Sequence, residues 1–202
     1  MKHSLLLVAV VALVAFAAPA HSQYMFLDTN NDGVCDTNDV LTALSTSVDV
    51  WIDTDNNQDT SPVTCQQSSA NLTINSYEVI VRSTGAITLG TWTDNMSFAT
   101  NFGDFTAGTD AYHGRGSGTA LAAGSYKLGS LAISGVATGA TLSIVSSSSA
   151  NPVGNTSFGS QCEGADFDNT LKLGSDWNDV CGTASPTPIT PTTWGYIKNI
   201  YK

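Results

Sequence analysis

Apolar residues that alternate with polar ones constrain this chain more than any other feature of its sequence. From Val48 onward, short runs of them recur at the two-residue period of a β-strand. The runs are Val48, Val50 and Ile52; Leu72 and Ile74; Tyr77, Val79 and Val81; Ile87 and Leu89; Tyr126 and Leu128; Leu131 and Ile133; and Leu142 and Ile144. Glycine-rich turn signals separate many of them, notably at Gly108 and from Gly114 to Gly118. Many short strands joined by such turns predict a mainly β fold, an antiparallel β-sandwich over residues 46–182.

One segment before the sandwich has helical spacing instead. Between Asn38 and Leu44, the apolar residues Val40, Leu41 and Leu44 fall on one face of a helix. We therefore expect a short helix there, which together with the preceding acidic loop would form an N-terminal unit over residues 23–45.

The first 22 residues have the three parts of a secretory signal peptide. Lys2 supplies the positive charge, Leu5 to Phe16 form the apolar run, and Ala18-Pro19-Ala20 is a small-x-small cleavage site. A membrane anchor is the alternative, but the apolar run is shorter than the roughly 20 residues that a bilayer requires. We expect residues 1–22 to be removed and the mature chain to be secreted, extracellular or at the cell surface, with no transmembrane span.

Charge and cysteine content agree with an extracellular role. The chain has 17 Asp and Glu against 7 Lys and Arg, a net charge of -10, which argues against a nucleic-acid partner and in favour of cations. Its four cysteines all follow the leader and form no C-x-x-C pair, so two disulfides are expected. The cysteines are Cys35, Cys65, Cys162 and Cys181. Their spacing alone leaves all three pairings open.

Residues 28 to 39, DTNNDGVCDTND, have the order of a calcium-binding loop. Oxygen donors occupy the alternate positions at which a curled backbone directs them to one ion, and a glycine permits the sharp bend. The expected ligands are the side chains of Asp28, Asn30, Asp32, Asp36 and Asp39 and the carbonyl of Val34, with Gly33 at the bend. Calcium suits these flexible, all-oxygen ligands better than magnesium does.

A second acidic cluster follows the strand that begins at Val48. Asp53, Asp55, Asn57 and Asp59 again occupy every other residue. The cluster lacks a glycine and a remote carboxylate, so a second calcium site and a solvated acidic turn are both open interpretations.

The end of the chain has a different composition. Residues 183–193, TASPTPITPTT, are rich in proline and threonine and predict an extended linker. Residues 194–202 follow as an amphipathic tail with Trp194, Ile197 and Tyr201 at helical spacing. This tail either packs on the sandwich or serves in recognition or sorting.

Two resemblances carry further expectations. Asp28, Asn30, Asp32, Gly33 and Asp39 match the D-x-N-x-D-G loop and later Asp of dockerin modules. Residues 48–182, through LTINSYEVIVRS, AITLGTW, SYKLGSLAISG and ATLSIVS, resemble cohesin-like and related carbohydrate-binding sandwiches of jelly-roll type from secreted bacterial proteins. The chain also resembles uncharacterised secreted bacterial proteins through LTINSYE, FGSQC and DFDNTLKLG; this likeness implies pairing of Cys65 with Cys162, and of Cys35 with Cys181.

The sequence favours a binding role over catalysis. It contains no G-x-S-x-G, H-E-x-x-H, S-x-x-K or P-loop motif, and His113, the one histidine after the leader, is expected in an exposed glycine-rich loop. We expect a non-catalytic, calcium-binding module for extracellular binding, adhesion or assembly, with a protein or polysaccharide partner or self-assembly. A carbohydrate-binding module is the alternative, with Trp51, Trp92 and Tyr112 as sugar platforms. A glycoside hydrolase that pairs Glu78 with Glu163 is a further alternative.

Overall fold

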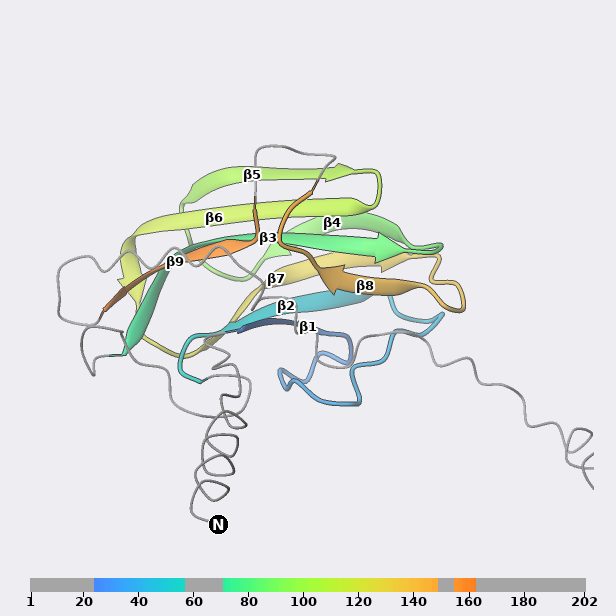
Figure 1. Cartoon of the computed structure of the whole chain (residues 1–202), viewed down its shortest axis with the longest axis horizontal. Coiled ribbons are helices and arrows are strands. Elements are labelled where there is room, and N and C mark those ends of the chain that lie inside the picture. Colours follow the sequence, from blue (N-terminus) through green and yellow to red (C-terminus); the bar gives the residue numbers. More distant parts are fainter. Residues whose placement is uncertain (1–23, 57–70, 149–154, 163–202) are drawn as a thin grey trace, which may run out of the picture.

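The computed structural model describes residues 24–56, 71–148 and 155–162, with side chains up to residue 159 (Figure 1). The expected signal peptide, linker and tail lie outside these ranges, as do Asn57, Asp59, Cys65, Glu163 and Cys181. Within the described residues, no helix is long and apolar enough to cross a membrane.

The described residues form nine strands. These are β1 (Tyr24–Asp28), β2 (Ser47–Asp53), β3 (Leu72–Thr84), β4 (Thr88–Asp94), β5 (Thr100–Ala107), β6 (Asp110–Leu121), β7 (Ser125–Ser134), β8 (Thr141–Ile144) and β9 (Ser157–Cys162). All of the strand pairs are antiparallel.

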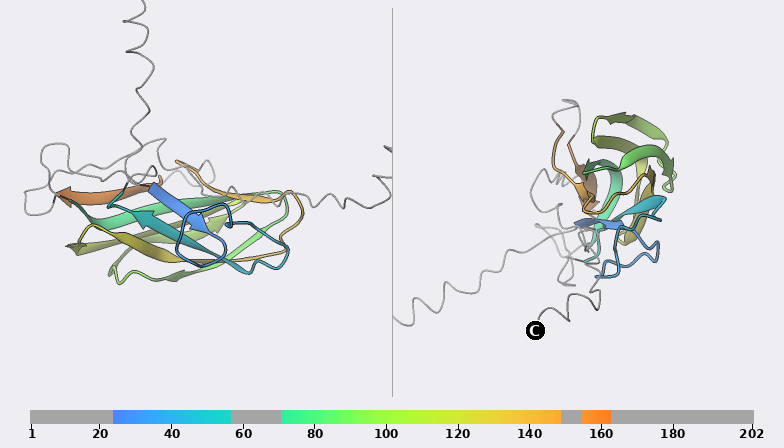
Figure 2. Two further views of the ribbon diagram at one scale, coloured as in Figure 1. Left: turned by 90° about the horizontal axis from the view of Figure 1, so that it is seen from below. Right: turned by 90° about the vertical axis from the view of Figure 1, so that its right-hand side faces the viewer.

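The strands make two sheets that pack face to face (Figures 1 and 2). One sheet has the order β1-β2-β7-β4, and the other has the order β5-β6-β3-β8, with β9 also paired to β3. Most neighbours within a sheet are not consecutive in sequence, so the chain crosses repeatedly between the two layers. The antiparallel β-sandwich predicted from the alternation is therefore confirmed.

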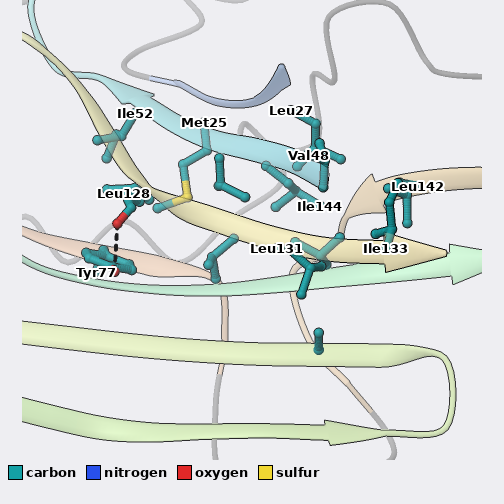
Figure 3. Packing of buried hydrophobic residues seen from close by; sticks show 14 of the residues in the cluster. Met25, Leu27, Val48, Ile52, Tyr77, Leu128, Leu131, Ile133, Leu142 and Ile144 are labelled. Carbon is teal, nitrogen blue, oxygen red and sulfur yellow. Dashed lines mark hydrogen bonds between the residues drawn. The ribbon is translucent and has the colours of Figure 1, made fainter. Parts of the chain in front are cut away.

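Apolar side chains from both sheets fill the space between them (Figure 3). The first sheet contributes Met25, Leu27, Val48, Val50, Ile52, Leu128, Leu131 and Ile133, and the second contributes Ile74, Tyr77, Val79, Val81, Leu142, Ile144 and Phe158. Each fully buried side chain of this size contributes about 1.5–3 kcal/mol to folding through burial of its apolar surface. The hydroxyl of Tyr77 donates to the carbonyl of Leu128 at 3.4 Å, which satisfies a polar group inside this core.

Two β-bulges explain why the apolar period changes within β3 and β7. Ile74 and Tyr77 both face the core although they are an odd number of residues apart, and the register of β3 shifts between Ile74 and Ser76. Likewise, Leu128 and Leu131 both face the core, and the pairing of β2 with β7 shifts between Val50 and Trp51. An extra residue in one strand restores the buried face after the period is broken.

The glycines from Gly114 to Gly118 do not form the predicted turn; they lie inside β6. The reason is close packing on the outer face of this sheet. A Cβ on Gly116 would lie 2.4 Å from Cζ of Phe102, and one on Gly114 would lie 2.9 Å from the Tyr112 hydroxyl. These glycines therefore allow neighbouring aromatic rings to pack closely on the strand, which is a second reason for glycine besides turn formation.

The expected helix between Asn38 and Leu44 does not form either. The segment consists of turns, in which Asp39 donates to the Asp36 carbonyl at 3.3 Å and Ser45 donates to the Thr42 carbonyl at 3.0 Å. Leu41 reaches the core, but Leu44 is 89% exposed. So short a segment makes few helical hydrogen bonds, and one buried side chain does not supply the packing that a helix needs.

Candidate metal centre and the surface beside it

The candidate calcium loop leaves the sandwich at the end of β1 and curls back along residues 28–39. Asn31 and Gly33 have positive φ angles of 62° and 76°, so the backbone bends sharply where the sequence predicts a bend. Asparagine and glycine are the residues that adopt this left-handed conformation most readily.

Asp28 forms the inner support of the bend. Its carboxylate accepts the backbone N–H of Asn31 at 2.6 Å and that of Gly33 at 2.8 Å. The side chain is fully buried, so the curled backbone encloses a negative charge. A carboxylate that accepts amide N–H groups in this way holds a tight loop in one conformation.

Asp39 closes the loop from its other end. Its carboxylate accepts the N–H of Thr29 at 2.8 Å and that of Asp36 at 3.1 Å, which ties the end of the loop to its beginning. Asp39 is also fully buried. Burial raises the pKa of its carboxyl, and the charges of Asp28 and Asp32 raise this pKa further, while the two amide hydrogen bonds oppose the shift. Three carboxylates of the loop are therefore close enough to affect one another.

The remaining predicted ligands lie on the outer side of the loop. Asp32 accepts the N–H of Val34 at 2.9 Å and the side-chain amide of Asn30 at 2.9 Å, and Asp36 accepts the N–H of Asn38 at 2.6 Å. In the described ranges, no three His, Cys, Asp or Glu side chains converge on one point as metal ligands. The donors of the loop are all oxygens, the chemistry that calcium prefers, and each carboxylate oxygen of Asp28 and Asp39 retains a lone pair beside its amide hydrogen bond.

The second acidic cluster forms a local turn as far as the structure describes it. Asp53 is largely buried, and its carboxylate accepts the N–H groups of Asp55 at 2.9 Å and Asn56 at 2.8 Å. Asn57 and Asp59 lie outside the described residues. The two interpretations of this cluster, calcium site and solvated turn, both stay open.

Cys35 lies within the candidate calcium loop and forms a disulfide, and the described residues include no free cysteine. The side chains of Cys65, Cys162 and Cys181 fall outside the described part. The presence of a disulfide at the loop is thus established, and its partner stays a prediction.

Trp51 links the candidate calcium loop to an adjoining pocket. It projects away from the core residues Val50 and Ile52, as the alternation predicts, and stacks on Phe26 with ring centroids 6.2 Å apart and planes at 7°. A Cβ on Gly33 would lie 3.2 Å from Cζ2 of Trp51, so the loop packs directly on the indole. Trp51 also lines a pocket of about 340 Å³.

The other two predicted sugar platforms have different surroundings. The ring of Trp92 stacks on His113 at 4.3 Å, and its Nε1 donates to Asp94 at 2.7 Å. Tyr112 is only 4% exposed, stacks on Phe105 at 4.9 Å and donates its hydroxyl to Glu78. Tyr112 therefore does not present an exposed ring to a sugar.

A network of charged side chains surrounds the buried His113, contrary to the prediction that this histidine lies in an exposed loop. His113 is 3% exposed within β6, and its Nδ1 lies 2.9 Å from the Asp104 carboxylate. Arg115 bridges Asp94 at 2.8 Å and Asp104 at 2.6 Å. The alternation of Ala111, His113 and Arg115 along one strand was the signal for their common inward face, and the neighbouring glycines concealed it.

The fold and the loop define a two-sheet antiparallel β-sandwich that carries an oxygen-rich loop at the end of its first strand. The chain matches no protein-family model, no curated protein and no solved structure.

Proposed function

We propose that this protein is a secreted, calcium-binding β-sandwich module that acts in extracellular binding, adhesion or assembly and does no chemistry. The observation that carries the proposal is the burial of Asp28 and Asp39 in a single short loop, each fully removed from solvent. The likenesses to dockerin loops and cohesin-like sandwiches point to the same kind of module.

Electrostatics gives the reason for a bound cation. Two carboxylates about 4 Å apart repel each other by roughly 4 kcal/mol at an effective dielectric constant of 20. The charges of Asp28 and Asp32 raise the pKa of Asp39, in addition to the larger effect of burial, so repulsion acts within the loop. The loop contains no Lys or Arg to offset it. A divalent cation would remove the repulsion and stabilise the curled backbone.

The ion would be held by the side-chain oxygens of Asp28, Asn30, Asp32 and Asp39 and by the carbonyl of Val34, with Asp36 at the position that often binds through water. Bound calcium supplies structural order to the loop. The disulfide at Cys35 supports an oxidising, extracellular compartment, in agreement with the predicted signal peptide.

Thermal unfolding with and without calcium tests the proposal. We expect the melting temperature in 1 mM Ca²⁺ to exceed that in EDTA by several degrees, because an ion that binds only the folded chain adds RT ln(1 + [L]/Kd) to stability. Terbium gives an independent readout: Trp51 packs on Gly33 and can sensitise the luminescence of Tb³⁺ bound in the loop.

Asp39→Asn and Asp55→Asn make a matched pair, because each removes one negative charge. We expect Asp39→Asn to lose both the calcium effect and the terbium signal, and Asp55→Asn to retain them. If only Asp55→Asn loses the calcium effect and the terbium signal, the ion binds at the second acidic cluster. Equal melting temperatures of the wild type in calcium and in EDTA would refute calcium binding.

A further inference from the structure

The pocket beside Trp51 is built from segments that the sheet brings together. Trp51 comes from β2, and Ser125, Tyr126 and Lys127 come from the first residues of β7, which pairs with β2. The segment after β4 adds Asn95, Met96 and Ser97, and the end of β6 adds Leu121. The volume of about 340 Å³ lies at the lower end of the range for small-ligand sites, roughly 300–1,000 Å³.

The lining combines flat aromatic surface with short polar groups. Trp51 supplies the ring, because Tyr126 pairs with Ile52 and packs against the core. Asn95, Ser97 and Ser125 add exposed polar side chains. A sugar ring has the complementary chemistry, because one face presents C–H groups that pack on an aromatic ring while its hydroxyls hydrogen-bond at the edge.

The charges of this region favour an uncharged ligand. The ammonium of Lys127 is paired with the Asp49 carboxylate at 2.5 Å, and the same carboxylate accepts the Ser130 hydroxyl at 2.6 Å. The one cation in the pocket lining is therefore neutralised by its neighbour. With a net charge of -10, the chain also repels acidic polysaccharides.

Trp51 is held in place before any ligand arrives. Its indole is stacked on Phe26 of β1 and contacted by Gly33 of the candidate calcium loop. A fixed aromatic platform loses little conformational entropy on binding, which improves affinity.

From these observations we infer that the pocket beside Trp51 is a binding site for a neutral carbohydrate chain. The inference rests on the proposed function as an extracellular binding module and names the class of its ligand. The candidate calcium loop acts on this site through Gly33 and Trp51, so that order in the loop fixes the platform.

Isothermal titration of the purified protein with cellohexaose, xylohexaose and mannohexaose, and with polygalacturonate as the acidic comparison, tests the inference. The protein should be made in a host that does not glycosylate it, because Asn95 begins an N-x-S site at the pocket. We expect at least one neutral oligosaccharide to bind and polygalacturonate not to bind. Absence of binding by all three neutral chains, or stronger binding of polygalacturonate, would overturn the inference.

Ser97→Trp fills the pocket without removing any packed group and should weaken binding at least tenfold, as should Trp51→Ala. Ser134→Trp is the matched control, since it adds the same side chain at the far end of β7, roughly 30 Å away at 3.3 Å per residue. Equal affinities in Ser97→Trp and the wild type would place the sugar elsewhere and refute the site.

Titrations in calcium and in EDTA separate the two proposals. If the protein binds a neutral oligosaccharide and calcium does not change its melting temperature, the carbohydrate site is supported and calcium binding is refuted. If calcium raises the melting temperature and no oligosaccharide binds, calcium binding is supported and the carbohydrate site is refuted.

Discussion

At the scale of single residues, His113 has surroundings that lower the pKa of its imidazole. It is buried under the ring of Trp92, and burial lowers its pKa from the ordinary 6.5. The Arg115 charge lowers the pKa as well, whereas the ion pair with Asp104 and the charge of Asp94 raise it; burial is the largest of these effects.

A lowered pKa in the folded state makes stability fall as the solution becomes acidic. The imidazole of the unfolded chain takes up a proton near pH 6.5, and that of the folded chain does so only at lower pH. Between these two pKa values, the unfolded chain binds more protons than the folded chain, so the free energy of unfolding decreases as the pH falls. The slope for one proton is at most about 1.4 kcal/mol per pH unit. We expect the free energy of unfolding to decrease from pH 7 to pH 5.5 in urea titrations.

His113→Gln should flatten this decrease, because His113 is the only histidine after the predicted leader. The folded-state pKa of Asp104 is lowered, so its contribution is lost only at more acidic pH, outside this window. Parallel pH profiles for the variant and the wild type would contradict the assignment.

Gly129 is a second residue whose surroundings permit a sharp prediction. A Cβ there would lie 2.4 Å from Cζ2 of Trp92 and 2.6 Å from the Thr93 carbonyl oxygen, so backbone as well as side chain must move. We expect Gly129→Ala to cost about 1–3 kcal/mol of stability, as overpacking does. Gly118→Ala is the control, because nothing lies within 4 Å of that position; a chemical denaturation curve for each variant measures the difference.

At the scale of elements, an ion pair joins β3 to β6 beside the start of β6. Arg82 donates Nε and Nη2 to the two oxygens of Asp110 at 2.7 Å each, and Asp110 is 3% exposed. The Arg82 hydrogen bonds are the largest cause of the lowered pKa of Asp110, so the buried carboxylate depends on its partner.

Arg82→Met should therefore destabilise the fold by about 1–3 kcal/mol, since it leaves a buried charge without its main donor. The double variant Arg82→Met with Asp110→Leu removes both partners and should recover part of this loss. Urea denaturation measures the stability of both variants. If Arg82→Met is as stable as the wild type, the ion pair contributes nothing to the stability of the β3–β6 pairing.

The alternation of apolar residues predicted β2, β3, β4, β7 and β8, because one face of each of these strands packs on the core. It did not reveal β5 and β6, in which small and charged residues replace the apolar pattern at the His113 network. The alternation did not predict β1 either, because Met25, Phe26 and Leu27 are all buried and its sequence is continuously apolar.

The candidate sites divide in the same way. Local spacing predicted the curled loop over residues 28–39, because the positions of its oxygens and its glycine follow one another along the chain. The pocket lining of Asn95, Ser97, Tyr126 and Lys127 could not be predicted, since these residues meet only when β2, β7 and the segment after β4 pack together. Only Trp51 was suggested by its outward face.

At the scale of the whole molecule, the candidate calcium loop and the pocket are neighbours that meet at Trp51. The loop joins β1 to β2, Cys35 within it forms a disulfide, and Gly33 packs on Trp51. Ion pairs occur in both sheets, with Arg82–Asp110 in the second, Lys127–Asp49 in the first, and Arg115 of β6 joined to Asp94 of β4. Changes in the loop should therefore alter ligand and metal affinity together, because Trp51 lies between the loop and the pocket.

The disulfide and the metal should then be coupled. Cys35→Ser frees the loop that holds Asp28 and Asp39, so more conformational entropy must be lost when calcium orders it, and the Kd for calcium should rise severalfold. The stabilisation by a given calcium concentration should shrink accordingly, and it should also shrink in the wild type treated with dithiothreitol. Calcium titrations followed by melting temperature measure both. An unchanged Kd in Cys35→Ser would show that β1 and β2 alone determine the conformation of the loop, and that the disulfide serves the rest of the chain.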